Sequence, residues 1–493
     1  MSSVIPRVAD TPPAAPAPLR RVADLPAPPG WPVLGNLPQL RPAGMHLQLA
    51  AWARQYGRIF RLRMGPQNVL VVADHEAVAT VLRDRPDGFR RTERQQLIGM
   101  EMGLKAGLFG SNGDEWRRQR RMVMAAFDPG HVKAYYPSLV KCGERLAGRW
   151  AKAAGSGRAI DLQADLMRFT VDAIAGLAFG TDVNTLESDE NIIQRHLDKI
   201  FPKLFTRMVS AVPYWRWFEL PSDKALARAL AAVDQAIDGF IADARIRLAD
   251  PARRAAPQNL LEAMLVAADE PGSGITDSQV AGNVMTMLLA GEDTTANTLA
   301  WAIWLLHGHP AALARAQTEA RRVMAGGGPV TLDHLAQLDY VEACMHETMR
   351  LRPVAPLMGL QALKEAVVGD VAVPTGTVVM VLMRHDSIDD QHVPEAALFK
   401  PERWLGEDGL SPAAPRRVSM PFGAGPRMCP GRYLALQEMK MVMLTLLVNF
   451  DIASVGTEHG GEPAERLMFA MAPVGLRMTL RKSVAAHAAG AAV

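Results

Sequence analysis

The residues around Cys429 combine a thiol, three glycines and an arginine in one short loop. Segment 422–431 reads Phe-Gly-Ala-Gly-Pro-Arg-Met-Cys-Pro-Gly, and a helical pattern follows from Arg432 to Val448. Free N–H groups and the helix dipole stabilise a thiolate at such a position. The glycines let the backbone fold closely around a flat ligand, and Arg427 could bind an anionic group on it. The alternative is a buried structural cysteine, the usual role of a lone cysteine in such a loop.

An acidic pair with a neighbouring hydroxyl interrupts a long apolar helix. Residues 290–295 read Ala-Gly-Glu-Asp-Thr-Thr, and burying carboxylates is costly unless they are paired or used. Gly291 leaves room for a close approach, and Thr294 can bond the carbonyl four residues before it, which loosens the helix and can admit water. Asp293 and Thr294 are therefore candidate catalytic residues, while Glu292 points about 100° away around the helix. The alternative is a solvated helix face.

Two further pairs lie at helical spacing. Trp116 and Arg120 occupy positions i and i+4 of one helix face and offer two kinds of hydrogen-bond donor to one anion. Glu347 and Arg350 lie three residues apart within another helix. Taken alone, the first pair is typical of a basic surface run and the second of a surface ion pair.

In their order and spacing, these four groups resemble the cytochrome P450 family of haem-thiolate mono-oxygenases. The resemblance covers nearly all of the chain after residue 28. It implies that Cys429 is the axial, metal-binding ligand of haem b, and that Trp116 and Arg120 bind a haem propionate. The residues it assigns to cofactor binding are Trp116, Arg120, Phe422, Gly425, Arg427 and Cys429.

The same resemblance assigns roles away from the cysteine loop. Thr294 is expected to hold bound oxygen and a water, and Asp293 to relay protons from outside. The helix containing Glu347–Arg350 is expected to join Arg403 in a buried structural network. Segment 384–386, Arg-His-Asp, departs from the commoner His-Arg-Asp order, which leaves its propionate contacts open.

The activity implied is insertion of one atom of dioxygen into an apolar organic substrate, by hydroxylation or epoxidation. The segments expected to line the pocket are rich in Met, Leu and Phe, which suits such a substrate; they are 95–108, 200–208, 285–289, 354–358 and 467–471. Arg90, Arg91 and Arg94 either are solvated or hold a substrate carboxylate.

Three other functions remain as alternatives. A peroxide-driven peroxygenase would not need Asp293 and Thr294. A haem sensor or electron carrier would fill both axial positions and would have no use for an apolar pocket. A helical scaffold without cofactor would be colourless.

Composition limits the class of protein. Of 493 residues, 49% are hydrophobic and 21% charged, as in an average soluble globular protein. A net charge of +3 argues against nucleic acid as a partner. The cysteines, Cys142, Cys344 and Cys429, form no C-x-x-C pair and favour a reducing, cytoplasmic setting. No charge-free apolar run is long enough for a membrane anchor.

We expect a bacterial-type soluble enzyme without a fused reductase, because no flavin or iron–sulfur motif is found. Electrons would come from a separate acidic ferredoxin- or flavodoxin-like donor, which would dock on Arg117, Arg118 and Arg121.

The predicted fold class is mainly α with a small β subdomain. One domain is expected over residues 28–482, between a disordered Pro- and Ala-rich tail at 1–27 and a frayed tail at 483–493. Helical periodicity predicts helices at 163–179, 234–248, 277–306, 310–324 and 335–351. A hairpin is predicted from 58–64 and 68–73 around Gly65-Pro66, with further strands within 367–382 and 467–480.

Overall fold

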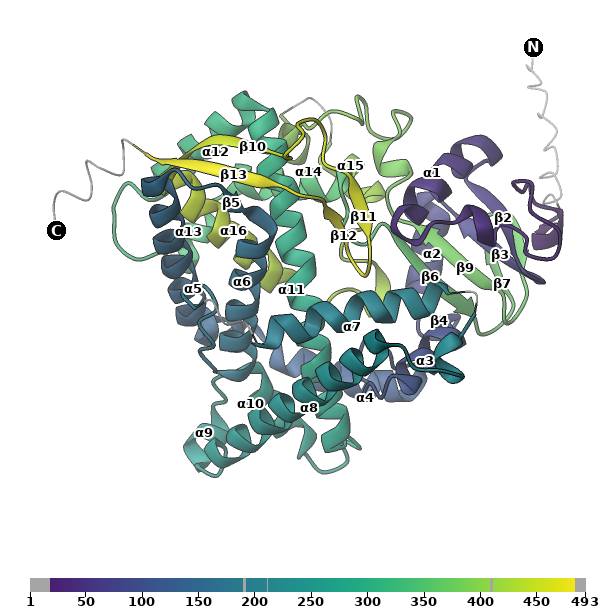
Figure 1. Ribbon diagram of the computed structural model, residues 1–493, viewed down its shortest axis with the longest axis horizontal. Helices are drawn as coiled ribbons and strands as arrows, with labels where there is room; N and C mark the ends of the chain where they lie inside the picture. Colours follow the sequence, from purple (N-terminus) through teal and green to yellow (C-terminus); the bar gives the residue numbers. More distant parts are fainter. Residues whose placement is uncertain (1–17, 189–191, 211, 408–410, 484–493) are drawn as a thin grey trace, which may run out of the picture.

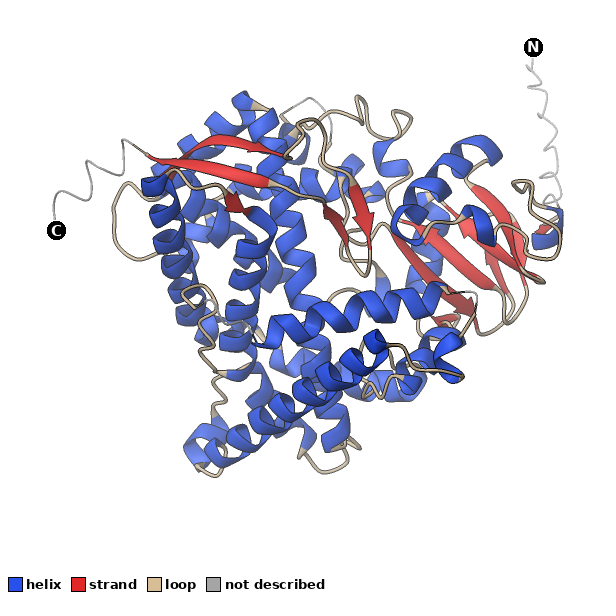
Figure 2. Cartoon of the chain, viewed as in Figure 1, coloured by secondary structure: helices blue, strands red, loops and turns tan. Residues whose placement is uncertain are grey.

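Helices dominate the structure, and the largest sheet lies at one end of it (Figures 1 and 2). The computed structural model describes residues 18–188, 192–210, 212–407 and 411–483. The helices are α1 (Met45–Tyr56), α2 (His75–Arg83), α3 (Glu93–Glu101), α4 (Gly113–Ala126), α5 (Pro129–Ser156), α6 (Leu162–Ile174), α7 (Ile192–Val209), α8 (Pro221–Arg247), α9 (Pro251–Ala255), α10 (Leu260–Ala268), α11 (Asp277–Gly308), α12 (Pro310–Val323), α13 (Leu332–Ala336), α14 (Asp339–Leu351), α15 (Ala413–Val418) and α16 (Arg432–Asn449). The expected fold class, mainly α with a small β subdomain, is confirmed.

The strands form one larger sheet and three small ones among the described residues. They are β1 (Arg20–Arg21), β2 (Ile59–Met64), β3 (Gln67–Val72), β4 (Phe89–Arg91), β5 (Ile160–Asp161), β6 (Leu357–Ala362), β7 (Ala366–Val368), β8 (Val371–Val373), β9 (Val378–Leu382), β10 (Phe450–Gly456), β11 (Glu465–Leu467), β12 (Met471–Pro473) and β13 (Arg477–Lys482). The larger sheet has the order β2-β3-β9-β6-β4. The small sheets are β1-β8-β7, β10-β13-β5 and β11-β12.

The predicted hairpin is confirmed as β2 and β3. The two strands are antiparallel, with Met64 opposite Gln67, and Gly65 adopts the positive φ of 61° that a tight turn favours. Along β3, Val69 and Val71 pack in the same apolar cluster as α1, while residues 70 and 72 pack with α2. Burial of both faces explains why this strand is a continuous apolar run rather than an alternating one.

α11 runs through the middle of the helical part of the molecule (Figure 1). Its first turn is closed by a capping box, in which Thr276 and Gln279 exchange side chain to backbone hydrogen bonds. It packs against α6, α8, α14 and α16, which is why it is apolar on nearly every side. α11 therefore fixes the predicted acidic pair and Thr294 at the centre of the fold.

The expectation of disorder over residues 1–27 is wrong from residue 18 onward. β1 pairs in parallel with β8, with Arg20 opposite Val371, and the side chains of Val22 and Leu25 are buried. Composition was misleading because the prolines flank a short sheet-edge segment rather than a coil. Residues 1–17 and 484–493 lie outside the described residues, whereas Ser483, expected to fray, is buried and its N–H bonds the carbonyl of Asn449.

The helix predicted over 335–351 is two helices, α13 and α14. Glu319 of α12 accepts hydrogen bonds from the N–H groups of Tyr340 and Val341, each at 2.9 Å. Because this carboxylate satisfies the free donors of a new helix start, the chain begins α14 afresh. The helix predicted at 234–248 is also longer than expected and starts at Pro221, a favoured first position.

Within the described residues, no helix combines the length and the apolarity needed to cross a bilayer.

Candidate active site

The loop that carries Cys429 lies between a 3-10 turn, η8 (Gly425–Arg427), and α16. The Cys429 N–H donates to the carbonyl of Phe422 at 2.9 Å, which closes the loop. Gly425 has φ 71°, and a Cβ there would lie 2.6 Å from the Cα of Arg83, at the end of α2. Glycine is therefore required at this position. The close approach that the sequence suggested toward a ligand is, at Gly425, an approach to α2.

The structure describes all three cysteines of the chain. Cys429 is exposed, whereas the other two are buried. Cys142 and Cys344 are buried in α5 and α14, and burial raises the pKa of both thiols. Although Cys429 is exposed as a residue, nearby protein atoms desolvate its thiol and raise its pKa, while the N–H of Gly431 and the guanidinium of Arg120 lower it. Of the three thiols, the structure leaves Cys429 accessible to a ligand.

Trp116, Arg120 and Arg427 converge from α4 and η8, as the sequence predicted. The Arg427 guanidinium lies 5.0 Å from the centre of the Trp116 ring and donates to the carbonyls of Leu108 and Ser111 at 3.0 and 2.7 Å. The Trp116 indole N–H and the Arg120 guanidinium bond no residue that the structure describes. Two donors without a described partner thus stand beside the guanidinium of Arg427.

Two more buried arginines join this group, and the sequence did not assign them to it. Arg85 and Arg91 are 3% and 9% exposed. Burial lowers the pKa of Arg85 to about 10. It also lowers the pKa of Arg91, with help from the charges of Arg427 and Arg85. Burial, together with Arg85 and Arg120, lowers the pKa of Arg427 to about 9.

We call Arg85, Arg91, Arg120 and Arg427 the arginine cluster. None of the four forms an ion pair with a carboxylate among the described residues, although Arg85 and Arg91 are buried and Arg120 and Arg427 half-buried, and buried charges are normally paired. An anionic ligand would supply the missing negative charge. A signal for Arg91 does exist in the sequence, because Phe89 and Arg91 occupy the two inward positions of β4.

The neighbouring arginines have protein partners instead. Arg90 pairs with Glu93, and Arg94 donates to the carbonyls of Arg207 and Met208 at the end of α7. Since Arg91 belongs to the arginine cluster, none of the three arginines considered for a substrate carboxylate is merely solvated.

Segment 384–386 is engaged with carboxylates. Arg384 donates to both carboxylate oxygens of Glu465 at 2.7 and 2.9 Å, and the Nδ1 of His385 lies 3.0 Å from Asp386. Arg384 and His385 thus have carboxylate partners within the protein, and a contact of either with a propionate stays untested.

On α11, the hydroxyl of Thr294 donates to the carbonyl of Ala290 at 2.8 Å, as predicted. The helix nevertheless stays continuous over its whole length, so no break accompanies this bond. Asp293 is half-buried, whereas Glu292 is 1% exposed. A Cβ on Gly291 would lie 3.3 Å from Ile174, so the close approach at this glycine is that of α6.

A buried carboxyl that the sequence reading overlooked links α11 to α16. Glu438 is 3% exposed and accepts a hydrogen bond from Thr295, the neighbour of Thr294. Burial raises the pKa of Glu438 to about 8, so the group carries a proton at neutral pH. It ties the helix of Thr294 to the helix that follows Cys429.

The predicted network of Glu347, Arg350 and Arg403 is present and fully buried. Arg350 donates to Glu347 twice, at 2.8 and 2.7 Å, and Arg403 donates to it at 3.0 Å. The indole N–H of Trp404 and the backbone N–H of Lys400 complete the carboxylate's contacts. Desolvation would raise the pKa of Glu347, but the hydrogen bonds and charge of Arg350 hold it below its usual value.

The sequence profile described as Cytochrome P450 matches residues 25–480. The chain belongs to the cytochrome P450 family. It is 26% identical to the protein LUTEIN DEFICIENT 5 of Arabidopsis thaliana, over 85% of this chain and 71% of that protein. It is 28% identical to cyclooctat-9-en-7-ol 5-monooxygenase of Streptomyces melanosporofaciens, over 87% of this chain and 89% of that protein.

A self-sufficient cytochrome P450 monooxygenase of Oidiodendron maius is also 28% identical, over 90% of this chain but 41% of that protein. Membership and these mono-oxygenase relatives make the chain a cytochrome P450 oxidoreductase that uses haem and acts as a mono-oxygenase. The family implies a haem bound through a cysteine thiolate. The residues present fit that group, because an exposed thiol stands close to buried cations without counter-ions, and a haem brings two propionates.

Proposed function

We propose that Cys429 is the axial ligand of haem b, and that the enzyme inserts one atom of dioxygen into an apolar organic substrate by hydroxylation or epoxidation. The observation that carries this proposal is the arginine cluster without carboxylates beside the exposed thiol. Bound haem would supply the activation of dioxygen, which a thiolate ligand favours by promoting O–O cleavage.

The protein's own part is to bind and orient the cofactor. Trp116 and the arginine cluster would bind the propionates, because their N–H donors have either no described partner or only uncharged ones. Phe422 holds the loop closed through its carbonyl, and Gly425 lets the loop rest on α2. The N–H of Gly431 donates toward the Cys429 sulfur, which favours the thiolate.

Spectroscopy of Cys429→Ser tests this proposal. Because a hydroxyl cannot replace a thiolate, we expect the carbon monoxide complex of the reduced variant to lose the red-shifted absorption band of thiolate ligation. Cys344→Ser is the matched control and should keep the band, since that thiol is buried in α14. A band that survives in Cys429→Ser would contradict the assignment.

Proton delivery is proposed for Thr294 and Asp293. The Thr294 hydroxyl donates to the Ala290 carbonyl, which leaves its oxygen free to accept a hydrogen bond from water. Asp293 precedes it on the same helix and is partly accessible, so its carboxyl can exchange protons with solvent. The pair would thus position one water and renew its proton.

Thr294→Ala should consume reducing equivalents while making less product, by at least about tenfold per electron pair. Product and hydrogen peroxide are measured against consumed reductant. Thr298→Ala is the control, since Thr298 makes the same kind of bond to a carbonyl four residues back but is buried. Equal yields in the wild type and Thr294→Ala would exclude this residue from proton delivery.

An apolar substrate is supported by the side chains near the arginine cluster. The rings of Phe109 and Phe469 lie 5.5 Å apart and tilted, and they come from the loop before α4 and from the β11–β12 turn. One similar protein is named for cyclooctat-9-en-7-ol, a largely hydrocarbon molecule. Substrate-induced shifts in the ferric haem spectrum would identify the class, and a preference for charged compounds would contradict it.

The electron donor is proposed to be a separate acidic ferredoxin- or flavodoxin-like protein in the cytoplasm, where three unpaired thiols are stable. The docking patch differs from the expected one. Arg121 is exposed, but Arg117 pairs with Asp87 and Asp114, and Arg118 lies against Gly274.

Arg83, whose backbone touches the cysteine loop, is also exposed and supplies a second positive charge on this side of the site. Attraction between opposite charges weakens as salt screens them. We therefore expect reduction of the haem to slow with rising ionic strength, as measured by stopped-flow absorbance. A rate that does not depend on salt would contradict an acidic donor.

A further inference from the structure

Three histidines surround one buried carboxylate at the start of α2, whereas the cysteine loop contacts the end of that helix. His75, the first residue of α2, places Nδ1 2.8 Å from Oδ2 of Asp386. His392 places Nε2 3.5 Å from the same oxygen, and His385 places Nδ1 3.0 Å from Oδ1. The side chains of Asp386 and His75 are 1% and 6% exposed, and the rings of His75 and His392 meet edge to face at 4.6 Å.

We propose that His75, Asp386 and His392 form a binding site for Zn²⁺, independent of the haem chemistry. Their three ligand atoms all lie within 4.8 Å of one another. Ligands at about 2.0–2.1 Å from a tetrahedral zinc stand roughly 3.3 Å apart, so small side-chain movements close the site. Two imidazole nitrogens and a carboxylate oxygen are ligands that zinc prefers, and a water would take the fourth position.

An unsatisfied nitrogen points to the ligand. The Nε2 of His392 is buried and has no hydrogen-bond partner among the residues described. A buried polar atom without a partner is costly, and a metal ion would satisfy it. Asp386 can bind the ion through Oδ2 because Oδ1 is held separately by His385 and by Arg58 at 3.3 Å. These outer contacts would orient the carboxylate.

Zinc binding requires a change in the tautomer of His75. Arg417 donates to its Nε2 at 3.1 Å, so the ring proton is on Nδ1, the nitrogen that faces Asp386. For zinc to bind at Nδ1 the proton must move to Nε2, where the resulting N–H faces the carboxylate of Glu76, 3.9 Å away. Arg417 must then give way, which its exposed side chain allows. The imidazole stays neutral, and no proton is lost from it.

The local charge suits a divalent cation. Three carboxylates, those of Glu76, Asp386 and Asp389, face two guanidinium groups, those of Arg58 and Arg417. If the imidazoles are left out of the count, these side chains carry one more negative than positive charge. A Zn²⁺ ion would therefore bind where the net charge attracts it.

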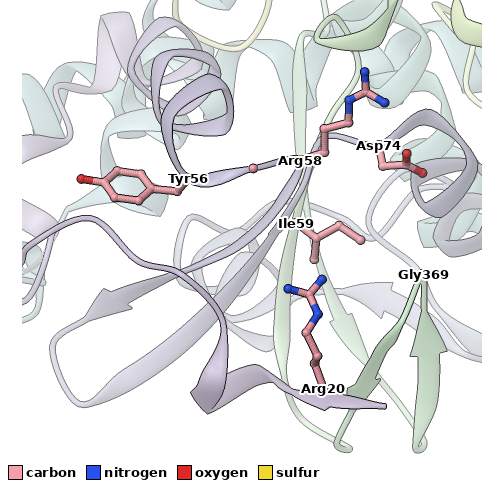
Figure 3. Close-up of a pocket in the computed structure, with 7 residues that line it drawn as sticks. Arg20, Tyr56, Arg58, Ile59, Asp74 and Gly369 are labelled. Carbon is pink, nitrogen blue, oxygen red and sulfur yellow. The ribbon is translucent and has the colours of Figure 1, made fainter. Parts of the chain in front are cut away.

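A surface hollow lies beside the cluster. This hollow of about 410 Å³ is lined by Arg58 and Asp74, with Arg20 and Gly369 on its other side (Figure 3). Asp74 immediately precedes His75, and Arg58 reaches from the hollow to Asp386. An ion would enter past Arg58.

The consequence of the site is structural. Zinc would join the start of α2 to the turn that holds His392, while the end of α2 supports Gly425 in the cysteine loop. The metal would thereby stabilise the helix on which the cysteine loop rests.

Titration of the haem-loaded, tag-free protein with Zn²⁺ tests the proposal, using calorimetry for affinity and elemental analysis for stoichiometry. The wild type should bind one ion per chain. His392→Ala should bind at least about tenfold more weakly, and His459→Ala, which removes an exposed histidine, should match the wild type. Zinc X-ray absorption should show imidazole scattering.

Arg417→Ala provides a second test, in the opposite direction. It removes the donor that competes at His75 without touching a ligand, so zinc should bind more tightly, by up to about tenfold. Arg416→Ala, which removes the exposed arginine next to it, is the matched control. The proposal is overturned if the wild type binds no stoichiometric zinc, if His392→Ala binds as tightly as the wild type, or if Arg417→Ala weakens binding.

Discussion

Two regions of this cytochrome P450 bury arginines, and they differ in whether a carboxylate balances the positive charge. In the Glu347 network, Arg350 and Arg403 share one carboxylate, and their remaining N–H groups donate to backbone carbonyls. In the arginine cluster, four guanidinium groups lie together and pair with no described carboxylate, and the charges of the other members lower the pKa of Arg91 and Arg427. Both regions are built from arginines that lie far apart in the sequence.

In the Glu347 network the protein itself balances the buried charge, whereas in the arginine cluster the balancing charge would have to come from a ligand. A buried ion pair with every donor satisfied fixes the packing of α14 against the η7 turn (Pro401–Trp404). A buried group of like charges costs free energy until an anion binds. The stability of the haem-free protein is therefore lowered at the arginine cluster and raised at the Glu347 network, which mutation can test.

The largest effect is expected for Glu347→Gln. The amide keeps the shape but loses the charge, so Arg350 and Arg403 would be left buried without a counter-ion. The free energy of unfolding should fall by about 3–5 kcal/mol with or without haem. Urea unfolding followed by circular dichroism measures this, and Glu402→Gln on the neighbouring turn is the control. A loss below about 1 kcal/mol would show that the network is not structural.

Glu438→Gln extends the comparison to a buried carboxyl without a cation. The pKa of Glu438 is about 8 in the folded protein and about 4.3 when unfolded. The folded state therefore binds a proton that the unfolded state releases, and this group's contribution to stability is present below about pH 4.3 and lost as the pH rises to 8. Glutamine stays neutral, so the variant should gain on the wild type by up to about 4 kcal/mol between pH 5 and pH 8.

Urea titrations at the two pH values measure that gain. Glu407→Gln is the control and should show almost no change against the wild type between pH 5 and pH 8, because Arg315 lowers the pKa of the exposed Glu407 and this carboxyl stays ionised in the folded and unfolded chains over that range. A stability difference between wild type and Glu438→Gln that is the same at pH 5 and pH 8 would mean that Glu438 is ionised in the fold.

The smallest effect, and the sharpest comparison, is expected for Arg91→Met. Replacing a buried, unpaired charge with an apolar chain of similar length should stabilise the haem-free protein by about 1–2 kcal/mol. The same change should weaken haem retention, measured as the rate of haem transfer to an acceptor protein. Arg90→Met, next along β4 but paired with Glu93, is the control. A variant that is less stable without haem and retains haem normally would place Arg91 in the core rather than the site.

Local patterns predicted much of the fold. The β2–β3 hairpin and α11 have strong turn and capping signals, so their bounds were predicted within a few residues. The division between α13 and α14 was missed because its cause, Glu319, is contributed by another helix. Pairing of residues 20–21 with β8 was missed for the same reason, since the partner strand lies far along the chain.

The candidate site divides in the same way. Cys429, Trp116, Arg120 and Arg427 were found because each belongs to a short motif. Arg85 and Glu438 belong to no such motif, and their roles depend on burial that only tertiary packing creates. The close approach at Gly291 was predicted without its partner, because spacing alone does not distinguish an approaching ligand from an approaching helix.

The contacts of Arg427 and Arg91 bear on how the enzyme is assembled in the cell. These two side chains donate to the carbonyls of Leu108, Phe109 and Ser111, so the same cations hold the loop before α4 and await the cofactor. While the cluster lacks an anion, repulsion among its charges works against closing this loop. On the function proposed above, binding of the cofactor's anionic groups would relieve this repulsion and favour closure of the segment between α3 and α4.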